Sequence, residues 1–492
     1  MTSKMQPKMK IPKKISLDSI PDDLQQILDR FIEHGFDVWV VGGALRDLLL
    51  GGIPKDWDLA TSASPQHVME LFPRVIAIGL RHGTVQIHTG QNNVEVTSCP
   101  AAGLEGILAD LKRRDFTINA LALSYPEGKL IDPFGGQNDL LSQTLKAVDD
   151  APMRFREDPL RTLRAGRFMS VYGFHLAPET FAALRDTAPQ LHLASRERIR
   201  EELFKMLPGE YFPDAFGWMV RGGVIQEILP ELMESSFAFT RRRMEDRGAD
   251  RGMQEHLRGP VESHNELDPP LNLGGVLDHT INTVHSSPPR LRVRLAALFH
   301  NLAELKRQTS DRESLSNQAR FRESALAAAA IMRRLRASRR QEQEVAFLVE
   351  KQVPDGVEAW TDAELRRFIA GVGVDLLDDV VDLAYAERTA RRDNSLGLRT
   401  LRSFHGRISQ ELKRSPPLRI QDLAISGRDV MRILRLNPGP LVGQLLRNVH
   451  QRVLEDPALN ESKILMDFLV KEYDIKFESN SRLRGEEEPQ GG

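Results

Sequence analysis

The sequence predicts an α+β protein in which a small head with a mixed sheet precedes several helical domains. Short β-patterned segments mix with helical ones from about residue 23 to 150. Beyond about residue 151, strand signals nearly vanish and apolar residues recur at helical spacing. A chain of 492 residues is also too long for one ordinary core, and its length is typical of about three or four domains.

Composition divides the chain further, because some stretches are too polar or too charged to build a core. The last residues are acidic and end in glycine, and a central stretch is charged and rich in turn-forming residues. The predicted segments are a flexible tail at 1–22, the head at 23–150, a helical neck at 151–233, a linker at 234–270, a helical domain at 271–390, a C-terminal helical domain at 391–478 and a disordered tail at 479–492.

The overall charge argues against a generally basic protein that coats RNA. Lys and Arg number 67 and Asp and Glu number 69, so the net charge is −2. Any RNA must be held by local patches, which occur at 112–114, at five arginines between 154 and 167, and at 241–243. Such arginine-rich stretches are also ordinary solvated helix faces.

Cysteine usage and hydropathy favour a cytoplasmic protein with no membrane span. Cys99 is the single cysteine, so neither an intramolecular disulfide nor a zinc site of several thiolates can form. No apolar run approaches the roughly 18 residues that a membrane span needs. The lysine-rich N-terminus lacks the apolar core of a secretory signal.

The first chemical motif is a glycine turn between a strand and a helix. Residues 38–41 are apolar and predict a short buried strand, and residues 44–50 predict the helix that follows. Gly42 and Gly43 let the backbone approach a phosphate closely, and amide groups at a helix start attract anions. The turn is therefore a candidate phosphate site.

Two carboxylates, Asp56 and Asp58, follow the glycine turn after about ten residues. Side chains alternate along a strand, so Asp56 and Asp58 are expected to point the same way. Trp57 and Leu59 are then expected to point into the core. Two parallel carboxylates suit Mg²⁺, which prefers oxygen ligands and keeps substrate phosphates in its shell. Either motif alone is common, but together they predict phosphoryl-transfer chemistry.

With these motifs the chain resembles the class II tRNA nucleotidyltransferases and bacterial poly(A) polymerases, within the polymerase-beta-like nucleotidyltransferases. The resemblance implies that 23–150 is a catalytic head of that fold and that 151–233 is a neck that binds the nucleotide base and RNA. It also implies that Asp56 and Asp58 are catalytic and hold Mg²⁺. The residues that it places beside the triphosphate are Gly42, Gly43, Arg46 and Asp47.

A second motif supports the resemblance. Residues 113–121 read Arg-Arg-Asp-Phe-Thr-Ile-Asn-Ala-Leu and resemble the family motif that holds the ribose and triphosphate. A guanidinium offers a planar fork of donors to phosphate, and a carboxylate accepts from a sugar hydroxyl. The resemblance thus assigns nucleotide binding to Arg114, Asp115 and Asn119. Without the first motif, a helix with a solvated charged end would be the better interpretation.

Residues 157–164 resemble the EDxxR motif, with which the family reads the incoming base in place of a nucleic-acid template. Asp158 and Arg161 are three residues apart, so on one helix they would share a face and offer an acceptor and donors to a base edge. The resemblance adds Arg164 to the nucleotide-binding set. Taken alone, the spacing favours an ordinary salt bridge on a solvated helix. Ser195 is expected to cap a following helix with a structural role.

A third carboxylate is expected beside the metal pair. Related nucleotidyltransferases carry one on a neighbouring strand, where it deprotonates or orients the attacking hydroxyl. Glu95 alternates with Val94 and Val96 in a strand pattern and is the candidate catalytic residue. An exposed acid on an edge strand is the alternative.

Part of the segment 271–390 resembles an HD phosphohydrolase domain, in which separated histidines and a His-Asp doublet bind metal. His279 and His300 match the histidines, but the doublet here reads His300-Asn301. Asparagine cannot supply the anionic oxygen that neutralises a divalent metal, which argues against phosphohydrolase activity. His279 and His300 are then expected to be buried helix histidines that serve packing.

One departure from the family pattern bears on nucleotide choice. Family members that complete CCA carry a flexible polar loop after the third-carboxylate strand, whereas 97–112 is only a short connection here. Its loss resembles members that add only two C residues. The resemblance therefore favours Mg²⁺-dependent addition of CC, or CCA, to the tRNA 3′ end from CTP and ATP. A poly(A) polymerase and a non-catalytic RNA-binding relative are the alternatives.

Overall fold

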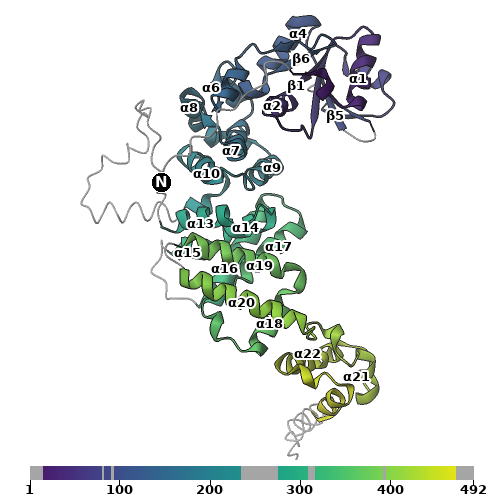
Figure 1. Ribbon diagram of the computed structural model, residues 1–492, viewed down its shortest axis with the longest axis vertical. Helices are drawn as coiled ribbons and strands as arrows, with labels where there is room; N and C mark the ends of the chain where they lie inside the picture. The colour runs from purple at the N-terminus through teal and green to yellow at the C-terminus, as the bar shows by residue number, and fades with distance from the viewer. Residues whose placement is uncertain are drawn as a thin grey trace, which may run out of the picture. The chain divides into compact units, whose positions relative to one another are not determined.

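The computed structural model describes residues 15–79, 83–89, 93–233, 275–307, 316–391 and 395–471. The chain divides into two compact units, and each is described by itself (Figure 1). Unit 1 comprises Met1–Asp278, Leu305–Asp311 and Ile331–Ser338, and unit 2 comprises His279–Glu304, Arg312–Ala330 and Arg339–Gly492. No helix in the described ranges combines the length and apolarity needed to cross a bilayer.

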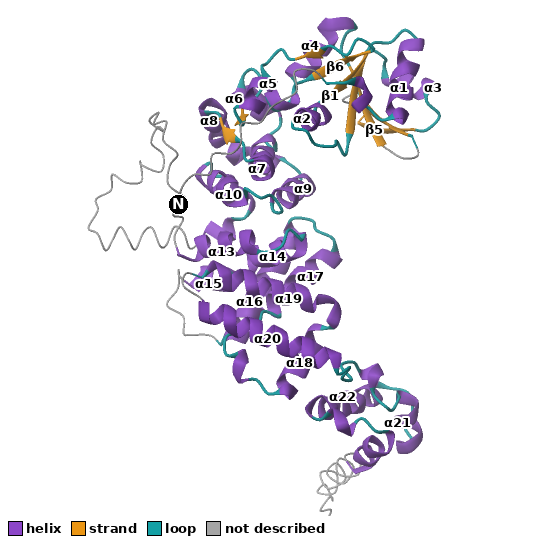
Figure 2. Ribbon diagram, viewed as in Figure 1, coloured by secondary structure: helices purple, strands orange, loops and turns teal. Residues whose placement is uncertain are grey.

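A mixed sheet forms the head, with seven strands among the described residues in the order β3-β4-β5-β2-β1-β6-β7 (Figure 2). β1 lies between β2 and β6 and is antiparallel to both, whereas β2 runs parallel to β5. All four residues of β1 are buried, which its unbroken apolar sequence explains. The strands are β1 Val38–Val41, β2 Trp57–Thr61, β3 Val75–Gly79, β4 Thr84–His88, β5 Asn93–Ser98, β6 Ala122–Tyr125 and β7 Leu130–Ile131.

Helix α4 packs against the central strands of the head. Ile107 and Leu111 of α4 share a buried cluster with Trp39 and Val41 of β1. α4 therefore rests on the strand that ends at the glycine turn. The head helices are α1 Asp22–Glu33, α2 Gly43–Leu49, α3 Pro65–Leu71, α4 Gly103–Lys112 and α5 Gly136–Leu141, with 3-10 turns at Leu17–Ser19 and Thr117–Asn119.

The predicted flexible tail at 1–22 is wrong for its last residues. Residues 15–22 are packed, because the apolar side chains of Ile15 and Ile20 are buried and α1 begins at Asp22. Residues 1–14, the predicted linker 234–270 and the predicted tail 479–492 lie outside the described residues.

The neck is helical, as the periodicity indicates. Ser195 accepts a hydrogen bond from the Arg198 N–H and caps α9, which confirms the predicted cap. A Cβ at Gly166 of α7 would lie 2.8 Å from the Met219 side chain, so α7 and α10 pack closely. The neck elements are α6 Ala151–Glu157, α7 Arg161–Tyr172, α8 Pro178–Thr187, η4 Ala188–Leu193, α9 Arg196–Met206, α10 Phe212–Arg221 and α11 Val224–Ile228, with a small sheet of β8 Thr144–Leu145 and β9 His175–Leu176.

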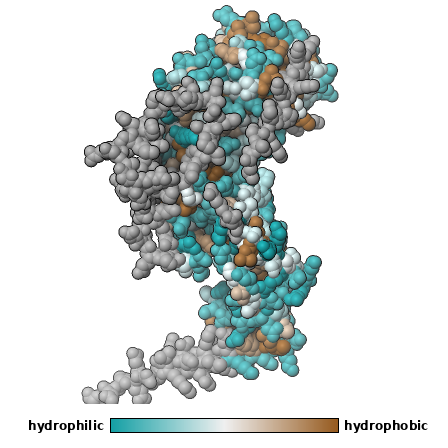
Figure 3. Space-filling view, turned by 60° about the vertical axis from the view of Figure 1, so that its left-hand side comes forward, coloured by the Kyte–Doolittle hydropathy of each residue, from teal (hydrophilic) through white to brown (hydrophobic). Residues whose placement is uncertain are grey.

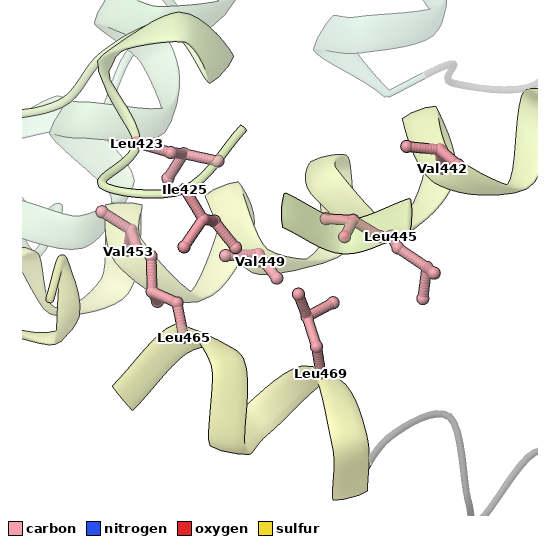
Figure 4. Packing of buried hydrophobic residues seen from close by; sticks show 9 residues of the cluster. Leu423, Ile425, Val442, Leu445, Val449, Val453, Leu465 and Leu469 are labelled. Carbon is pink, nitrogen blue, oxygen red and sulfur yellow. The ribbon is translucent and has the colours of Figure 1, made fainter. Parts of the chain in front are cut away.

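The chain from residue 275 onward is helical in its described residues. Its C-terminal part has a core of its own, in which Leu423, Val449 and Leu465 pack together (Figure 4). On the face drawn in Figure 3, hydrophilic residues predominate and hydrophobic ones lie in separate small patches. The helices are α13 Gly275–Ser286, α14 Leu291–Phe299, α15 Leu302–Arg307, α16 Asn317–Arg334, α17 Arg339–Glu350, η6 Val357–Ala359, α18 Asp362–Val372, α19 Val374–Ala390, α20 Ser395–Lys413, η7 Ile420–Asp422, α21 Gly427–Leu434, α22 Pro440–Glu455 and η8 Pro457–Leu459.

Candidate functional site

The glycine turn brings the backbone against two charged side chains. Gly42 separates β1 from α2 and has a φ of +75°, a conformation that L side chains rarely adopt. A Cβ at Gly42 would lie 2.6 Å from Nη1 of Arg114 and 3.4 Å from Oδ2 of Asp58. The structure therefore places residues of three sequence motifs in one spot.

Asp58 and Glu95 are neighbours on parallel strands, because Asp58 of β2 is the register partner of Glu95 in β5. Burial raises the pKa of Asp58; Arg114 opposes this shift, and Asp56 adds to it. Glu95 is exposed, but partial desolvation and then the adjacent Asp58 still raise its pKa. Both the burial and the mutual repulsion disfavour the ionised carboxylates, and a bound cation would relieve the repulsion.

The position of Asp56 differs from the expectation. β2 begins at Trp57, so Asp56 precedes the strand and is exposed. The reason is that β1 ends at Val41, opposite Asp58, and then turns away, so the antiparallel ladder offers Asp56 no partner. Trp57 and Leu59 are buried, as predicted.

The donor chemistry at the adjacent strands β2 and β5 fits a divalent cation. Mg²⁺ typically takes one or two carboxylates together with water and substrate phosphates. Among the described residues, no three or more His, Cys, Asp or Glu side chains form a ready-made metal cage. Asp56 and Asp58 would thus hold the ion through two oxygen donors and leave its other positions to water and nucleotide.

Asp110 orients Arg114 and is a site residue that the sequence motifs missed. Nε and Nη2 of Arg114 donate to Oδ2 of Asp110 at 3.1 and 3.0 Å. Nη2 of Arg113 donates to Oδ1 of the same carboxylate at 3.3 Å, and Asp110 is only 5% exposed. Because one edge of the Arg114 guanidinium is used in this way, Nη1 faces Gly42. The available signal was the spacing of four residues between Asp110 and Arg114.

Asp115 is buried and held by partners from two elements. Nε of Arg164 donates to Oδ2 at 2.8 Å, and Nδ2 of Asn119 donates to Oδ1 at 2.9 Å. The Phe116 N–H also donates to Oδ1 at 2.8 Å. Burial alone would raise the pKa of Asp115, but Arg164 and these hydrogen bonds outweigh it and hold that pKa well below its usual range. Three predicted nucleotide-binding residues therefore lie together.

Arg46 is only 8% exposed and uses its donors inside the protein. Nε and Nη2 donate to Oδ1 of Asp47 at 3.0 and 2.8 Å, and Nη1 donates to Oδ1 of Asn119 at 2.7 Å. Nη2 also donates to the hydroxyl of Tyr172 at 2.8 Å. Arg46 thus joins the glycine turn to the neck helix α7, and its contact with a triphosphate stays a prediction.

The same network continues through Glu202, which is buried in α9. Nη1 of Arg164 and Nη1 of Arg167 donate to Oε1 of Glu202 at 3.4 and 3.2 Å. The guanidinium carbon of Arg167 lies 4.6 Å from the centre of the Phe168 ring. Arg167 and Glu202 were not among the predicted site residues, although Arg164 and Arg167, three residues apart, share one face of α7.

Asp158 and Arg161 do not sit on one helix, so that expectation is wrong. Asp158 is extended after α6, because Pro159 disfavours helical backbone at the residue before it, and α7 begins at Arg161. Nη2 of Arg198 donates to Oδ2 of Asp158 at 2.7 Å. Arg161 donates to the carbonyl oxygens of Arg113 at 2.7 Å and Arg154 at 2.8 Å. The two residues therefore have separate partners, and neither the shared helix face nor the alternative of a salt bridge between them is observed.

The HD-like region retains a polar cavity. The Nε2 atoms of His279 and His300 lie 3.4 Å apart, and both residues line a cavity of about 320 Å³ with Asn301 and Glu387. Burial and then His279 lower the pKa of His300 to about 3, so its ring is neutral near pH 7. The expected burial is confirmed for His300, which is 2% exposed, whereas His279 is half-buried.

Three family models match separate parts of the chain. Residues 38–146 match the model described as "Poly A polymerase head domain". Residues 173–235 match "Probable RNA and SrmB-binding site of polymerase A", and residues 319–469 match a domain 2 of tRNA nucleotidyltransferases.

Curated relatives carry the name CCA-adding enzyme. The one from Geobacillus stearothermophilus is 41% identical over 219 residues, which are 42% of this chain and 54% of that protein. The chain therefore spans about half the length of the first curated relatives that it matches. The relative from Lactococcus lactis subsp. cremoris (strain MG1363) is 27% identical over 481 residues, covering 94% of this chain and 100% of that protein.

Solved structures show the same architecture. The CCA-adding enzyme of Bacillus stearothermophilus in complex with CTP has a TM-score of 0.65 and 25% identity, covering 94% of this chain and 100% of that one. A CCA-adding enzyme in complex with ATP, at 21% identity and a TM-score of 0.57, has the same fold. The predicted α+β fold, with a nucleotidyltransferase-type head before helical domains, is confirmed.

Proposed function

We propose that the chain is a member of the family of poly(A) polymerase head domains and tRNA nucleotidyltransferases, whose models match 38–146, 173–235 and 319–469, and that it adds CMP to the 3′ end of tRNA without a nucleic-acid template. The substrates would be CTP, ATP if CCA is completed, and tRNA lacking its 3′ end. Curated relatives and solved structures named CCA-adding enzyme support this choice. The single cysteine suits the reducing cytoplasm in which we place the reaction.

The observation that carries the proposal is the meeting of Gly42, Asp58 and Arg114. A Cβ at Gly42 would lie within 3.4 Å of both charged side chains, so a phosphate at this turn is within reach of a guanidinium and a carboxylate together. A protein that only binds RNA would need a basic surface, and it would have no use for the paired carboxylates of Asp58 and Glu95 beside the glycine turn.

In the proposed reaction the tRNA 3′-oxygen forms a bond to the α-phosphorus, and the bond from that phosphorus to the β-phosphate oxygen breaks, which releases pyrophosphate. Mg²⁺ held at Asp56 and Asp58 would supply charge neutralisation. Glu95 would orient the hydroxyl and accept its proton, for which its raised pKa suits it. Catalysis then depends mainly on positioning and electrostatic stabilisation.

The motif resemblance supports the nucleotide-binding roles. Arg114 would contact the phosphates beside Gly42 and Gly43, and Asp115 with Asn119 would hold the ribose. Asp158 and Arg161 would present an acceptor and donors to the base, with Arg164 beside them. The assignment of 23–150 as the catalytic head and 151–233 as the base-binding neck belongs to this proposal.

A CC-adding activity is favoured over a CCA-adding one by the connection after β5. Only residues 99–102 separate β5 from α4, so the segment that could carry a flexible loop is short. Incubation with tRNA lacking its 3′ end, Mg²⁺ and either CTP or ATP tests the choice. Addition of two C residues supports the proposal, long A tails indicate a poly(A) polymerase, and no addition under any condition indicates a binding protein.

Replacing one metal carboxylate tests the catalytic assignment. Asp56→Ala should abolish CMP incorporation, because one of two oxygen donors to Mg²⁺ is lost. Since Asp56 is exposed, folding should be unaffected, and tRNA retention in a filter-binding assay should be unchanged. Undiminished incorporation by the variant would refute the metal assignment.

A further inference from the structure

The far end of helix α7 carries a contact to which the proposed reaction assigns no role. The hydroxyl of Tyr172 accepts a hydrogen bond from Nη2 of Arg46 at 2.8 Å and donates to Oδ1 of Asp47 at 3.1 Å. Burial raises the pKa of Tyr172, so the hydroxyl keeps its proton near neutral pH and remains a donor.

Aromatic packing holds the Tyr172 ring in place as well as its hydroxyl. The ring stacks on Phe174 with 5.5 Å between centres and an angle of 15°. The guanidinium carbon of Arg46 lies 4.8 Å from the Tyr172 ring centre and 5.2 Å from that of Phe168. The hydroxyl therefore meets α2 in one orientation.

Helix α7 contacts the head near both of its ends, and at its first residue Arg161 donates to the carbonyl oxygen of Arg113 at 2.7 Å. Arg164 pairs with Asp115 at 2.7 Å near the start of the helix, and Tyr172 contacts Arg46 and Asp47 at its end. Eight residues separate Arg164 from Tyr172, which is about 12 Å along a helix. Contacts at both ends fix the direction of the helix, whereas contacts at its start alone would leave its far end free to tilt.

We propose that the Tyr172 hydroxyl is a positioning group that sets the direction of α7 and thereby the placement of Arg161 and Arg164 against the nucleotide base. The inference rests on the proposed function. Arg161 occupies the first helical position of α7, at the opposite end from Tyr172, so a small tilt of the helix displaces it. Base-edge hydrogen bonds tolerate displacements of about 0.5 Å, and a misplacement of about 1 Å can cost up to about 100-fold.

The test compares Tyr172→Phe with Tyr125→Phe. Each variant removes only a hydroxyl group that donates to a carboxylate within unit 1. Tyr125, the last residue of β6, donates to Asp29 of α1, just as Tyr172 donates to Asp47. Equilibrium dialysis with Mg²⁺ but no tRNA gives the dissociation constants for CTP and UTP. We expect Tyr172→Phe to weaken CTP binding about tenfold and to reduce the CTP-over-UTP preference at least about threefold. Tyr125→Phe should change neither value.

The preference separates positioning from simple loss of folded protein, because a smaller folded fraction leaves the ratio of the two constants unchanged. An unaltered ratio in Tyr172→Phe overturns the inference. As a second check, Asp47→Asn should lower the ratio in the same direction, and the double variant should lower it no further than the larger single change. Fully additive effects would also overturn it.

Failure of the proposed function has a distinct signature. Wild-type protein that binds CTP with a base preference but incorporates no CMP into tRNA contradicts the activity, while the Tyr172→Phe ratio still decides the positioning role. Wild-type protein that binds neither nucleotide overturns both.

Discussion

Gly42 is the residue at which two physical demands coincide. Its φ of +75° suits only glycine, and the space beside it is filled by Arg114. Arg114 cannot simply swing aside, because Asp110 holds its Nε and Nη2. A side chain here would therefore either strain the turn or detach the guanidinium from its partner.

Gly42→Ala should consequently reduce CMP incorporation at least about tenfold and lower stability by about 1–2 kcal/mol. Gly35→Ala is the matched control, because Gly35 has a similar φ of +77° but nothing within 4 Å of its Cβ position. The control should lose about 1 kcal/mol of stability and keep full kcat/KM. Equal losses of kcat/KM in the two variants would show that the clash with Arg114 is unimportant.

The reactivity of the Cys99 thiol depends on pH and reports the negative charge of Asp110 nearby. Burial, and then Asp110, raise the pKa of the thiol to about 12. At pH 9 only roughly a thousandth of the thiol is then the reactive thiolate, and the fraction rises about tenfold per pH unit up to the pKa. The rate of alkylation by iodoacetamide should therefore rise about tenfold per pH unit above pH 9, whereas the rate for free cysteine levels off near pH 9. Because Cys99 is the single cysteine, mass spectrometry reports it directly.

Asp110→Asn removes a charge that raises the pKa of Cys99 while Arg113 and Arg114 still lower it. Alkylation at pH 9 should therefore become faster in the variant. Slower alkylation, or a rate that reaches its plateau near pH 9 in the wild type, would contradict the assigned surroundings of the thiol.

At the scale of elements, the short connection between β5 and α4 is packed tightly against the helix that it precedes. A Cβ at Gly106 of α4 would lie 1.7 Å from the carbonyl oxygen of Ala101. The chain can fold back onto α4 in this way only because residue 106 has no side chain. The connection therefore packs directly against the first turn of α4.

Gly106→Ala should destabilise unit 1 by on the order of 3 kcal/mol, since backbone and not a flexible side chain must move. Gly406→Ala is the matched helical control, because its Cβ position in α20 has nothing within 4 Å. That substitution should stabilise its helix by about 0.5–1 kcal/mol. Thermal unfolding of both variants checks that Gly106→Ala lowers stability while Gly406→Ala raises it. An unchanged stability of Gly106→Ala would show that the backbone around Ala101 can move aside at little cost.

The elements also show what local sequence can predict. The β1 strand, the glycine turn and the cap at Ser195 depend on neighbours within a few residues, and these predictions agree with the structure. The helix joining Asp158 to Arg161 was predicted from spacing alone, without the effect of Pro159 on the residue before it.

Long-range partners were beyond the reach of the sequence. Arg46 pairs with Asn119 and Tyr172, which lie 73 and 126 residues away, and no local pattern connects them. Glu202 was overlooked for the same reason, because its partners Arg164 and Arg167 lie on another helix. Asp110 lies only four residues before Arg114, and what the sequence did not show is that its carboxylate is buried.

At the scale of the whole molecule, the HD-like region contains a polar cavity but lacks the carboxylate of the doublet. The neutral amide of Asn301 replaces an anionic metal ligand beside His300. The chain should therefore release no phosphate from p-nitrophenyl phosphate with Mg²⁺, Mn²⁺ or Ni²⁺. A metal-dependent release that His300→Ala abolishes would contradict this expectation.

The network between head and neck has a consequence for how a nucleotide can enter. Three guanidinium groups, those of Arg46, Arg164 and Arg167, meet three carboxylates, those of Asp47, Asp115 and Glu202. These pairs leave little surplus positive charge for a triphosphate bearing about four negative charges, and the ionised carboxylates of Asp58 and Glu95 on the adjacent strands β2 and β5 would repel it. Occupancy should therefore track the concentration of magnesium-complexed nucleotide, and the uncomplexed anion should be a poor competitor.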